Sequence, residues 1–573
     1  MLPSSCFRFV PGFLIPPIAA FLIVSCAGQV PPSGGPEDYE PPGIVSVYPV
    51  PYTTGYKDHL IALEFNEFVD RNSVNESIFI SPAVGPLEFA WSGKEVEISF
   101  AQRLRENTTY VVTVGTDVKD HRRGNRMAQA FTLAFSTGDF IDPGRIEGTV
   151  HAASPDKSPE GVMMFAYKLD GMDPDTLNPS THEPDYITQT GADGGFFFRH
   201  VTIGRYRLFA VRDEFRNLRY DAETDEFGVL QHDVVLTSAD TLVGGLVIRM
   251  AREDTTAPRL VDVRAENNML LTLRFSEGLD STGVSRLSVQ MNDTVSGKPL
   301  DVRAVAFKVP EWREISVVTA PQDSGLVYVV GVTGLRDSAG LIVSPLADRL
   351  AVEGSATPDT VAPAVVRTTF ADSTKNVGID PVIAVYFSEP VLNPSDGPLA
   401  TLRDTVEGIP CDIAWLGQGV ELKPRRPLRS LMWHTVSVQN GMLEDHAGNK
   451  GRDTLLTFRF QTLDTERFSG IEGVVVEGSG VDTLGPIILT ARDANRKGVV
   501  AGQVRIEHSG PFVFDRLLEG RYTLEAFRDR NENGRYDGGV VHPFVPSERF
   551  TVHSDTLRLR ARWPLEGVVM RLY

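Results

Sequence analysis

Cysteine is nearly absent from this chain: its 573 residues contain three, Cys6, Cys26 and Cys411. The first two lie in an N-terminal segment that differs from the rest of the chain, so Cys411 is left without a partner for an intramolecular disulfide bond. Metal sites built from clustered cysteines are excluded for the same reason. Stability must come from hydrophobic cores instead, and a 42% content of hydrophobic residues allows several of them.

Basic residues are in deficit as well. Lysine and arginine total 56 against 75 acidic residues, and the formal net charge is −19. Nucleic acid is excluded as a partner, because phosphate binding needs concentrated positive charge. The acidic surface favours solubility and could hold divalent cations.

Known catalytic motifs are also missing. The sequence has no GxSxG, no HExxH, no phosphate-binding loop and no dinucleotide-binding glycine fingerprint. We therefore predict that the protein is not an enzyme. One alternative stays open, which is a glycan- or peptide-processing enzyme whose carboxylates follow no recognised motif.

Helical periodicity is scarce, and short runs of alternating apolar and polar residues take its place. Examples are Leu60 to Phe65, Tyr110 to Val114 and Phe131 to Phe135. Alternation with a period of two is typical of half-buried strands. The sequence predicts an all-β fold, and a length of 573 residues requires several domains.

One apolar run stands at the N-terminus. The stretch from Phe9 to Val24 is short for a membrane span and is interrupted by three prolines. Together with the positive charge of Arg8, it indicates a signal peptide over residues 1–25.

The end of this segment, Ile23-Val24-Ser25-Cys26, resembles the lipobox of bacterial lipoproteins. The resemblance implies cleavage before Cys26, diacylation of its sulfur, and acylation of the new amino group by a fatty acid such as palmitate. The alternative is an ordinary signal peptide with an accidental cysteine. Residues 26–43 are rich in proline and glycine after the cysteine and are expected to form an extended tether. Ala27, where an aspartate would signal retention in the inner membrane, favours the outer membrane, at its periplasmic face or at the cell surface.

One type of repeat occurs three times in the body of the chain. Each copy opens with a linker that contains proline, continues with a strand that ends near an acidic residue, and later has a turn with an aspartate. The strands read LEFNEFVD at 63–70, LRFSEGLD at 273–280 and VYFSEPVL at 385–392, and the turns read VKDHRRGN at 118–125, LRDSAGL at 335–341 and LEDHAGN at 443–449. These copies resemble the bacterial Ig-like domain named after the S-layer protein SbsA, and the second copy is the most divergent.

A second type of repeat occurs twice. GRIEGTV at 144–150 matches SGIEGVV at 469–475, and a longer segment at 194–213 matches 510–529. The longer segments resemble the carboxypeptidase regulatory-like, or transthyretin-like, sandwich, in which Tyr206 and Tyr522 are expected to point into the core. Such modules accompany enzymes but carry no peptidase chemistry.

Together the repeats predict a tandem array of about five β-sandwiches behind the signal peptide and the tether. We name them blocks 1 to 5. The Ig-like blocks are block 1 (44–140), block 3 (254–353) and block 4 (359–464), and the transthyretin-like blocks are block 2 (144–251) and block 5 (469–573). Domains of this size are roughly 30–40 Å across, so straight junctions would give a body about 150–200 Å long.

Block 5 contains the sharpest local motif for a metal. Asp529, Asn531, Asn533 and Asp537 follow the spacing of a Ca²⁺ loop, with a glycine at its sixth position. Val540 stands where an EF-hand needs a bidentate glutamate. The alternative is a turn in which the Asp and Asn side chains bind the backbone.

The acidic residues that recur in the Ig-like copies form a second candidate. If strand ends and turns meet near the linker residues Asp254 and Asp359, their carboxylates would form interdomain sites that resemble those of cadherin-like modules and suit Ca²⁺. The alternative is structural, with each aspartate capping its own turn. The residues concerned are Glu67, Asp120, Glu277, Asp337, Glu389 and Asp445.

These observations predict a non-catalytic lipoprotein of the cell envelope that serves as a multidomain binding or spacer module. The lipid would fix one end to a membrane, and loops at the domain tips would contact an envelope protein or a polysaccharide. An adhesin stiffened by Ca²⁺ is the alternative within the same class.

Overall fold

The computed structural model describes residues 39–572 apart from 83, 155, 281–286, 309–311, 345–346, 395–396, 479–481 and 497. The predicted signal peptide, Cys26 and most of the predicted tether lie outside the described residues. Within the described part, the strands form ten sheets, and the one α-helix is the short α1 (Arg71–Glu76). The predicted all-β fold of tandem sandwiches is confirmed. No helix in this part of the chain is long and apolar enough to cross a membrane.

Block 1 consists of two antiparallel sheets with the orders β1-β2-β5-β4 and β3-β6-β7. Its strands are β1 (Ile44–Tyr48), β2 (Leu60–Phe65), β3 (Ile78–Ser81), β4 (Leu87–Ser92), β5 (Glu95–Phe100), β6 (Thr109–Val114) and β7 (Phe131–Ser136). β2 buries alternate residues, as the sequence pattern predicts, and β5 does the same, but the alternation predicted for Phe131 to Phe135 is wrong, because the last four residues of β7 are all buried. The half-buried pattern is wrong for β6, which is buried along its whole length. Val111 of this strand packs into the core of block 2, so both faces of β6 are covered.

Blocks 3 and 4 are also two-sheet sandwiches. The sheet orders are β17-β18-β22-β21 and β20-β19-β23-β24 in block 3, and β25-β27-β31-β30 and β26-β33-β32-β28-β29 in block 4. Block 3 contains β17 (Leu260–Ala265), β18 (Leu270–Phe275), β19 (Ser288–Asp293), β20 (Pro299–Leu300), β21 (Val302–Phe307), β22 (Glu314–Thr319), β23 (Val327–Thr333) and β24 (Arg349–Glu353). Block 4 contains β25 (Val365–Thr368), β26 (Thr374–Val377), β27 (Ile383–Phe387), β28 (Ala400–Asp404), β29 (Gly408–Ile409), β30 (Cys411–Trp415), β31 (Gly419–Pro424), β32 (Trp433–Gln439), η3 (Asn440–Met442) and β33 (Leu455–Thr462), and η4 (Thr465–Arg467) follows.

Blocks 2 and 5 share a different topology. In each, a three-stranded sheet pairs its first and last strands in parallel, as β8 with β15 and β34 with β41. Block 2 contains β8 (Gly144–His151), β9 (Met163–Lys168), η1 (Pro174–Thr176), β10 (Tyr186–Gln189), β11 (Gly195–Val201), β12 (Gly204–Arg212), β13 (Glu226–Val229), β14 (Val234–Leu236), β15 (Leu242–Arg249) and β16 (Ala251–Arg252). Block 5 contains β34 (Phe468–Glu477), β35 (Ile487–Asp493), β36 (Val500–Ile506), β37 (Pro511–Leu518), β38 (Gly520–Arg528), β39 (Phe550–Val552), β40 (Leu557–Leu559) and β41 (Leu565–Leu572).

The two tyrosines of this second repeat are buried, as predicted. Tyr206 is 0% exposed and Tyr522 is 4% exposed. Each hydroxyl donates to the backbone carbonyl four residues earlier, that of Thr202 at 2.9 Å and that of Leu518 at 2.8 Å. A buried phenol needs such a partner, so the same internal bond recurs in both copies.

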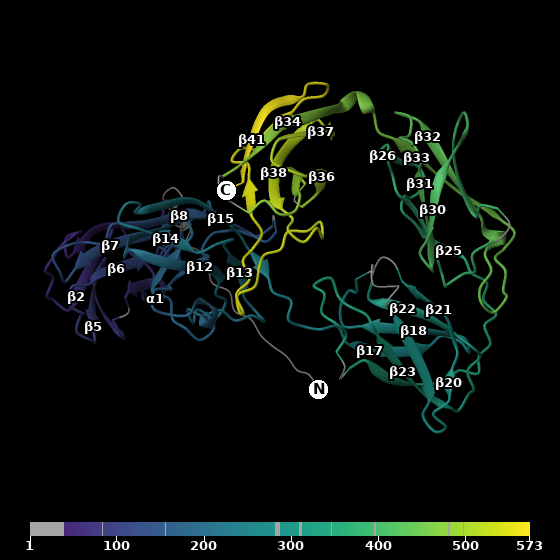
Figure 1. Ribbon diagram of the computed structural model, residues 1–573, viewed down its shortest axis with the longest axis horizontal. Helices are drawn as coiled ribbons and strands as arrows, with labels where there is room; N and C mark the ends of the chain where they lie inside the picture. The colour runs from purple at the N-terminus through teal and green to yellow at the C-terminus, as the bar shows by residue number, and fades with distance from the viewer. Residues whose placement is uncertain are drawn as a thin grey trace, which may run out of the picture.

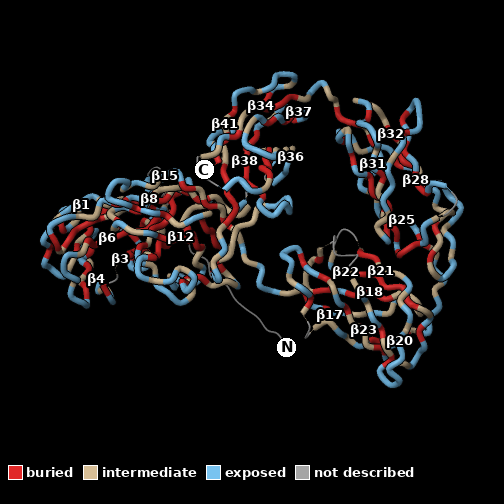
Figure 2. The backbone as a smooth tube through the Cα atoms, viewed as in Figure 1, coloured by how far each residue is buried: buried red, intermediate tan, exposed pale blue. Residues whose placement is uncertain are grey.

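Each block has its own hydrophobic core, and Figure 2 shows the buried residues gathered between the sheets of each block. The blocks do not form a straight rod. Figure 1 shows the chain running from blocks 1 and 2 through blocks 3 and 4 and then turning back, so that block 5 lies beside block 2. Val541 and Phe544 of block 5 pack with Phe209 and Val229 of block 2 in one apolar cluster. The extended body that straight junctions would give is therefore wrong for this structure.

Candidate functional sites at the block junctions

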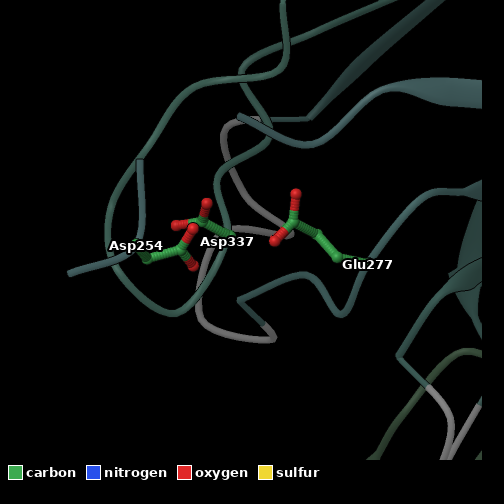
Figure 3. A group of neighbouring side chains, drawn as sticks. All are labelled: Asp254, Glu277 and Asp337. Carbon is green, nitrogen blue, oxygen red and sulfur yellow. The ribbon is translucent and has the colours of Figure 1, made fainter. Parts of the chain in front are cut away.

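Three acidic side chains from separate parts of the chain meet where block 2 joins block 3 (Figure 3). Asp254 lies in the linker after β16, Glu277 follows β18, and Asp337 lies in the turn after β23. One carboxylate oxygen of each residue lies within 4.8 Å of the others. A β-bridge between Leu279 and Asp337 holds the strand end and the turn together. We call this group the first acidic triad.

The carboxylates of the first acidic triad are incompletely satisfied. Asp337 is 2% exposed, and its Oδ1 accepts a hydrogen bond from the backbone N–H of Leu341 at 2.9 Å. Among the described residues, nothing donates to the buried Oδ2 of Asp337 or to the buried Oε1 of Glu277. Burial, followed by repulsion from Asp254 and Asp337, raises the pKa of Glu277 despite two arginines nearby. Negative charge is therefore disfavoured here unless a cation accompanies it.

The same arrangement recurs where block 3 joins block 4. Asp359 in the linker, Glu389 after β27 and Asp445 in the turn after η3 again place one oxygen each within 4.8 Å of the others. Oδ1 of Asp445 accepts from the backbone N–H groups of Ala447 and Asn449, both at 2.8 Å, and its Oδ2 accepts from the side-chain amide of Asn449, also at 2.8 Å, unlike the Oδ2 of Asp337. We call this group the second acidic triad.

Glu389 is a residue of the second acidic triad whose pKa is shifted. Its side chain is 8% exposed, and within the described part of the chain it has no hydrogen bond or ion pair. Burial, followed by repulsion from Asp359 and Asp445, raises the pKa of Glu389 to about 8. The carboxyl group therefore binds a proton at neutral pH when no other cation is present.

Polar contacts tie the second acidic triad to block 3. Nδ2 of Asn267 in block 3 donates to Oδ2 of Asp359 at 2.7 Å. Nearby, Oγ of Ser316 donates to Oε1 of Gln418 at 3.0 Å, and this bond between blocks 3 and 4 is buried. Asp359 thus connects block 3 to two acidic residues of block 4.

The equivalent aspartate of block 1 has a different environment. Oδ1 of Asp120 accepts from the backbone N–H groups of Arg122, Arg123 and Gly124, and Oδ2 accepts from that of Asn125, all within 3.1 Å. Burial alone would raise the pKa of Asp120, but these four donors outweigh it and lower the pKa. The structure therefore supports the structural alternative, turn capping, at Asp120.

A sequence signal for the linker position extends to block 1. An aspartate stands four residues before the buried proline of each linker: Asp38 before Pro42, Asp254 before Pro258 and Asp359 before Pro363. The sequence prediction named the linker aspartates of the later two copies and missed the first. Asp38 lies outside the described residues, and Glu67 lies half-buried beyond the end of β2.

The predicted Ca²⁺ loop of block 5 satisfies its own polar groups. Asp529 accepts from the backbone N–H groups of Asn533 at 3.0 Å and Gly534 at 2.8 Å. The side-chain amides of Asn531 and Asn533 donate to Oδ2 of Asp537 at 2.7 and 3.0 Å. These contacts account for the residue types as a hydrogen-bonded turn, and the Ca²⁺ site at this loop stays a prediction.

Block 5 closes against block 2 through a mixed apolar and polar contact. The guanidinium of Arg207 lies 3.7 Å from the ring centroid of Phe544, and Asp233 accepts from the same guanidinium at 2.8 Å. Oγ of Ser547 donates to the carbonyl oxygen of Val229 at 2.9 Å in a buried position. We call this contact the closure interface.

A cavity of about 390 Å³ lies beside the closure interface and is lined in part by arginines. Arg249 and Arg492 approach Glu525 at 3.9 and 2.9 Å, and Arg252 donates to the carbonyl oxygen of Glu223 at 3.0 Å. These guanidinium groups are therefore already engaged by the protein itself.

Cys411, in β30, is a free and half-buried thiol. Burial, followed by the charge of Asp412, raises its pKa to about 11. At neutral pH the group is therefore a thiol, which is a weak nucleophile.

Two segments of the chain, residues 38–137 and 359–462, match the family model described as a bacterial Ig-like domain. They correspond to blocks 1 and 4, and the other three blocks fall outside these matches. No curated protein matches the chain.

Solved structures similar to this chain include the N-terminal part of the bacterial S-layer protein SbsC, a multidomain fragment of titin, and BcpA, the major pilin subunit of Bacillus cereus. Their sequence identities are 11%, 12% and 9%, and their TM-scores are 0.16, 0.15 and 0.13. The matches cover 36%, 48% and 75% of this chain, and 44%, 94% and 99% of the other chains. The chain thus spans less than half of the SbsC fragment, and likeness at these TM-scores carries no function across.

Proposed function

We propose that the protein is a non-catalytic module of the bacterial cell envelope, exported and anchored by lipid on Cys26, that supports or contacts other envelope components. The observation that carries the proposal is the construction of the chain from tandem sandwiches, two of which match the bacterial Ig-like family. Domains of this kind present loops on a rigid framework, which suits binding and support.

The arginines beside the closure interface and the thiol of Cys411 also favour a role without catalysis. Arg249, Arg252 and Arg492, beside the closure interface, are engaged by acidic side chains or carbonyl groups of the protein. Cys411 is held as a thiol by its raised pKa. Neither group is prepared to act on a substrate.

The lipid anchor is tested by labelling cells that produce the protein with radioactive palmitate. We expect label on the parent and on Cys6→Ala, which alters only the predicted signal peptide, and no label on Cys26→Ala. Mass spectrometry of the mature N-terminus should find a modified Cys26. Label that persists in Cys26→Ala, or an unmodified mature Cys26, would contradict the anchor.

The non-catalytic role is tested by a broad screen for hydrolase activity on glycans and peptides, with the purified full chain. We expect no turnover above background. Turnover that falls in Glu389→Gln or Asp445→Asn would replace this proposal with the enzyme alternative. Protease accessibility on intact cells then distinguishes the cell surface from the periplasmic face.

A further inference from the structure

The two acidic triads are built in the same way at the two ends of block 3. In each triad, the first acid comes from the linker, the second follows a later strand, β18 or β27, and the third comes from a turn further along the chain. The strand end and the turn are joined by equivalent β-bridges, Leu279 with Asp337 and Val391 with Asp445. The chain therefore gathers three carboxylates at each junction from positions far apart in the sequence.

Proximity of carboxylates alone is common on protein surfaces, and the buried oxygen of Asp337 supplies a separate observation. Its Oδ2 is buried and lacks a hydrogen-bond donor among the described residues, and Figure 3 shows the carboxylate of Asp337 lying between those of Asp254 and Glu277. An unpaired buried carboxylate oxygen is costly, because it has lost water without gaining a partner. A cation placed between the three side chains would remove that cost.

We propose that Asp254, Glu277 and Asp337 bind a Ca²⁺ ion at the junction of blocks 2 and 3, and that Asp359, Glu389 and Asp445 bind another at the junction of blocks 3 and 4. The inference does not depend on the envelope function, since it concerns the chain's own junctions.

The donor set selects the kind of cation. The groups contain carboxylates without histidine or cysteine, and hard oxygen ligands suit Ca²⁺ rather than zinc or copper. Two oxygens on opposite sides of a Ca²⁺ ion, each about 2.4 Å from it, are about 4.8 Å apart. The oxygens of each triad lie close enough together for one ion to reach all three. Mg²⁺ demands a stricter octahedron and keeps more of its waters, so it should bind more weakly.

A bound Ca²⁺ ion would connect each linker to the block that follows it. Asp254 is exposed in the linker, whereas Asp337 is buried in block 3. A shared ion would fix the direction in which the linker enters block 3, and the second ion would do the same for block 4. The path by which block 5 returns to block 2 runs through both junctions (Figure 1).

The test uses the full chain, purified in detergent and stripped with EDTA, and titrates it with CaCl₂ by calorimetry and equilibrium dialysis. We expect dissociation constants on the order of 10⁻⁴ to 10⁻³ M, the range of extracellular modules, and binding at least about tenfold weaker for MgCl₂. Asp337→Asn and Asp445→Asn should each reduce the number of bound Ca²⁺ ions by one, and the double variant by two.

Asp404→Asn is the matched control. Asp404 is an equally buried aspartate of block 4 that lies outside the triads and accepts from the backbone N–H groups of Val406 and Glu407. This variant should leave the number of bound ions unchanged. No binding at millimolar CaCl₂, or a number of ions that Asp337→Asn and Asp445→Asn do not alter, would overturn the proposal.

Hydrogen exchange in EDTA separates a ligand from a purely structural residue. Because Asp337→Asn keeps the oxygen that accepts from Leu341 and removes a charge, the turn at 335–341 should be at least as protected as in the parent. With CaCl₂, protection should rise in the parent and not in the variant. If the turn in Asp337→Asn is less protected than in the parent in EDTA, and if Ca²⁺ adds no protection in the parent, the residue has a structural role. That result would contradict the proposal.

Discussion

Two buried glutamates of this chain have opposite surroundings. Glu477, at the end of β34 in block 5, forms ion pairs with Arg528 and Arg549, and its side chain is 5% exposed. Glu389, at the junction of blocks 3 and 4, is 8% exposed and faces Asp359 and Asp445. Inside a block the chain supplies its own countercharge, whereas at the junction it gathers charge of one sign. The difference indicates that the neutralising partner at the junction comes from outside the chain.

The largest effect is expected when the paired glutamate is removed. Glu477→Ala leaves Arg528 and Arg549 buried without their acid, which should destabilise block 5 by about 3–5 kcal/mol. Glu389→Gln, measured in EDTA at pH 8, should leave block 4 as stable as the parent or more stable, because it removes a charge that nothing in the described chain compensates. Chemical denaturation, followed by hydrogen exchange of peptides from β34 and β27, measures both.

The informative quantity is the difference between the stability changes caused by Glu477→Ala and by Glu389→Gln. A loss of several kcal/mol in Glu389→Gln under EDTA would mean that this carboxylate already has a stabilising partner within the chain. The two buried glutamates would then be equivalent, and the argument for an external cation would fail.

The second prediction concerns the closure interface, which is held by apolar and aromatic contacts instead of acidic ones. Phe544→Ala removes the ring beside Arg207 and Phe209 and should cost about 2–4 kcal/mol of contact free energy. Block 5 should then separate from block 2, and small-angle X-ray scattering should record a larger radius of gyration with and without CaCl₂. Val545→Ala is the control, because that side chain is 47% exposed. An unchanged radius for Phe544→Ala would show that the junctions alone hold the blocks in place.

A third prediction compares matched turns. Asp120→Ala removes an acceptor for four backbone N–H groups and should lower the stability of its turn by about 1–3 kcal/mol. Asp337→Ala in EDTA removes an acceptor for the backbone N–H of Leu341 only, together with an unpaired oxygen, and should cost less. Hydrogen exchange of residues 118–125 and 335–341 provides the measurement. Equal losses would show that the turn aspartates do the same structural work in blocks 1 and 3.

The sequence was sufficient for the fold and named all six members of the triads. Alternation and internal repeats predicted the all-β architecture, because both are local properties of the chain. The recurring strand ends and turns pointed to Glu277, Asp337, Glu389 and Asp445, since repeats place equivalent residues at equivalent points of a sandwich. The pairing of each turn with its own strand end then follows from the β-bridges.

The closure interface could not be predicted in this way. Val541 and Phe544 resemble ordinary residues of a loop, and nothing local indicates that they pack on block 2. Contacts between distant blocks depend on the shapes of two finished surfaces and on the angles of the junctions between them. The buried length of β6, which depends on block 2, escaped prediction for the same reason.

The smallest effect expected is a pH dependence of the closure interface. His151, at the end of β8, lies edge-on to Phe550 of block 5, with ring centroids 6.0 Å apart. Burial lowers the pKa of His151 below its usual value near 6.5. The charge of Glu525 raises this pKa, and the charge of Arg249 lowers it further. Because the pKa of His151 is lowered in the closed state, the neutral form of its side chain favours that state. Its contribution is therefore complete above about pH 6.5 and is lost as the pH falls through the lowered value.

The sign of this effect distinguishes His151 from Glu548, a glutamate of block 5 whose pKa is also shifted. Burial raises the pKa of Glu548 to about 7, so its contribution to stability is present at low pH and is lost as the pH rises toward 7. Scattering at pH 8 and pH 5 should show a modest opening at the lower pH in the parent chain and none in His151→Gln. Opening at high pH instead would assign the dependence to Glu548, and opening at low pH that persists in His151→Gln would place the sensitive group elsewhere.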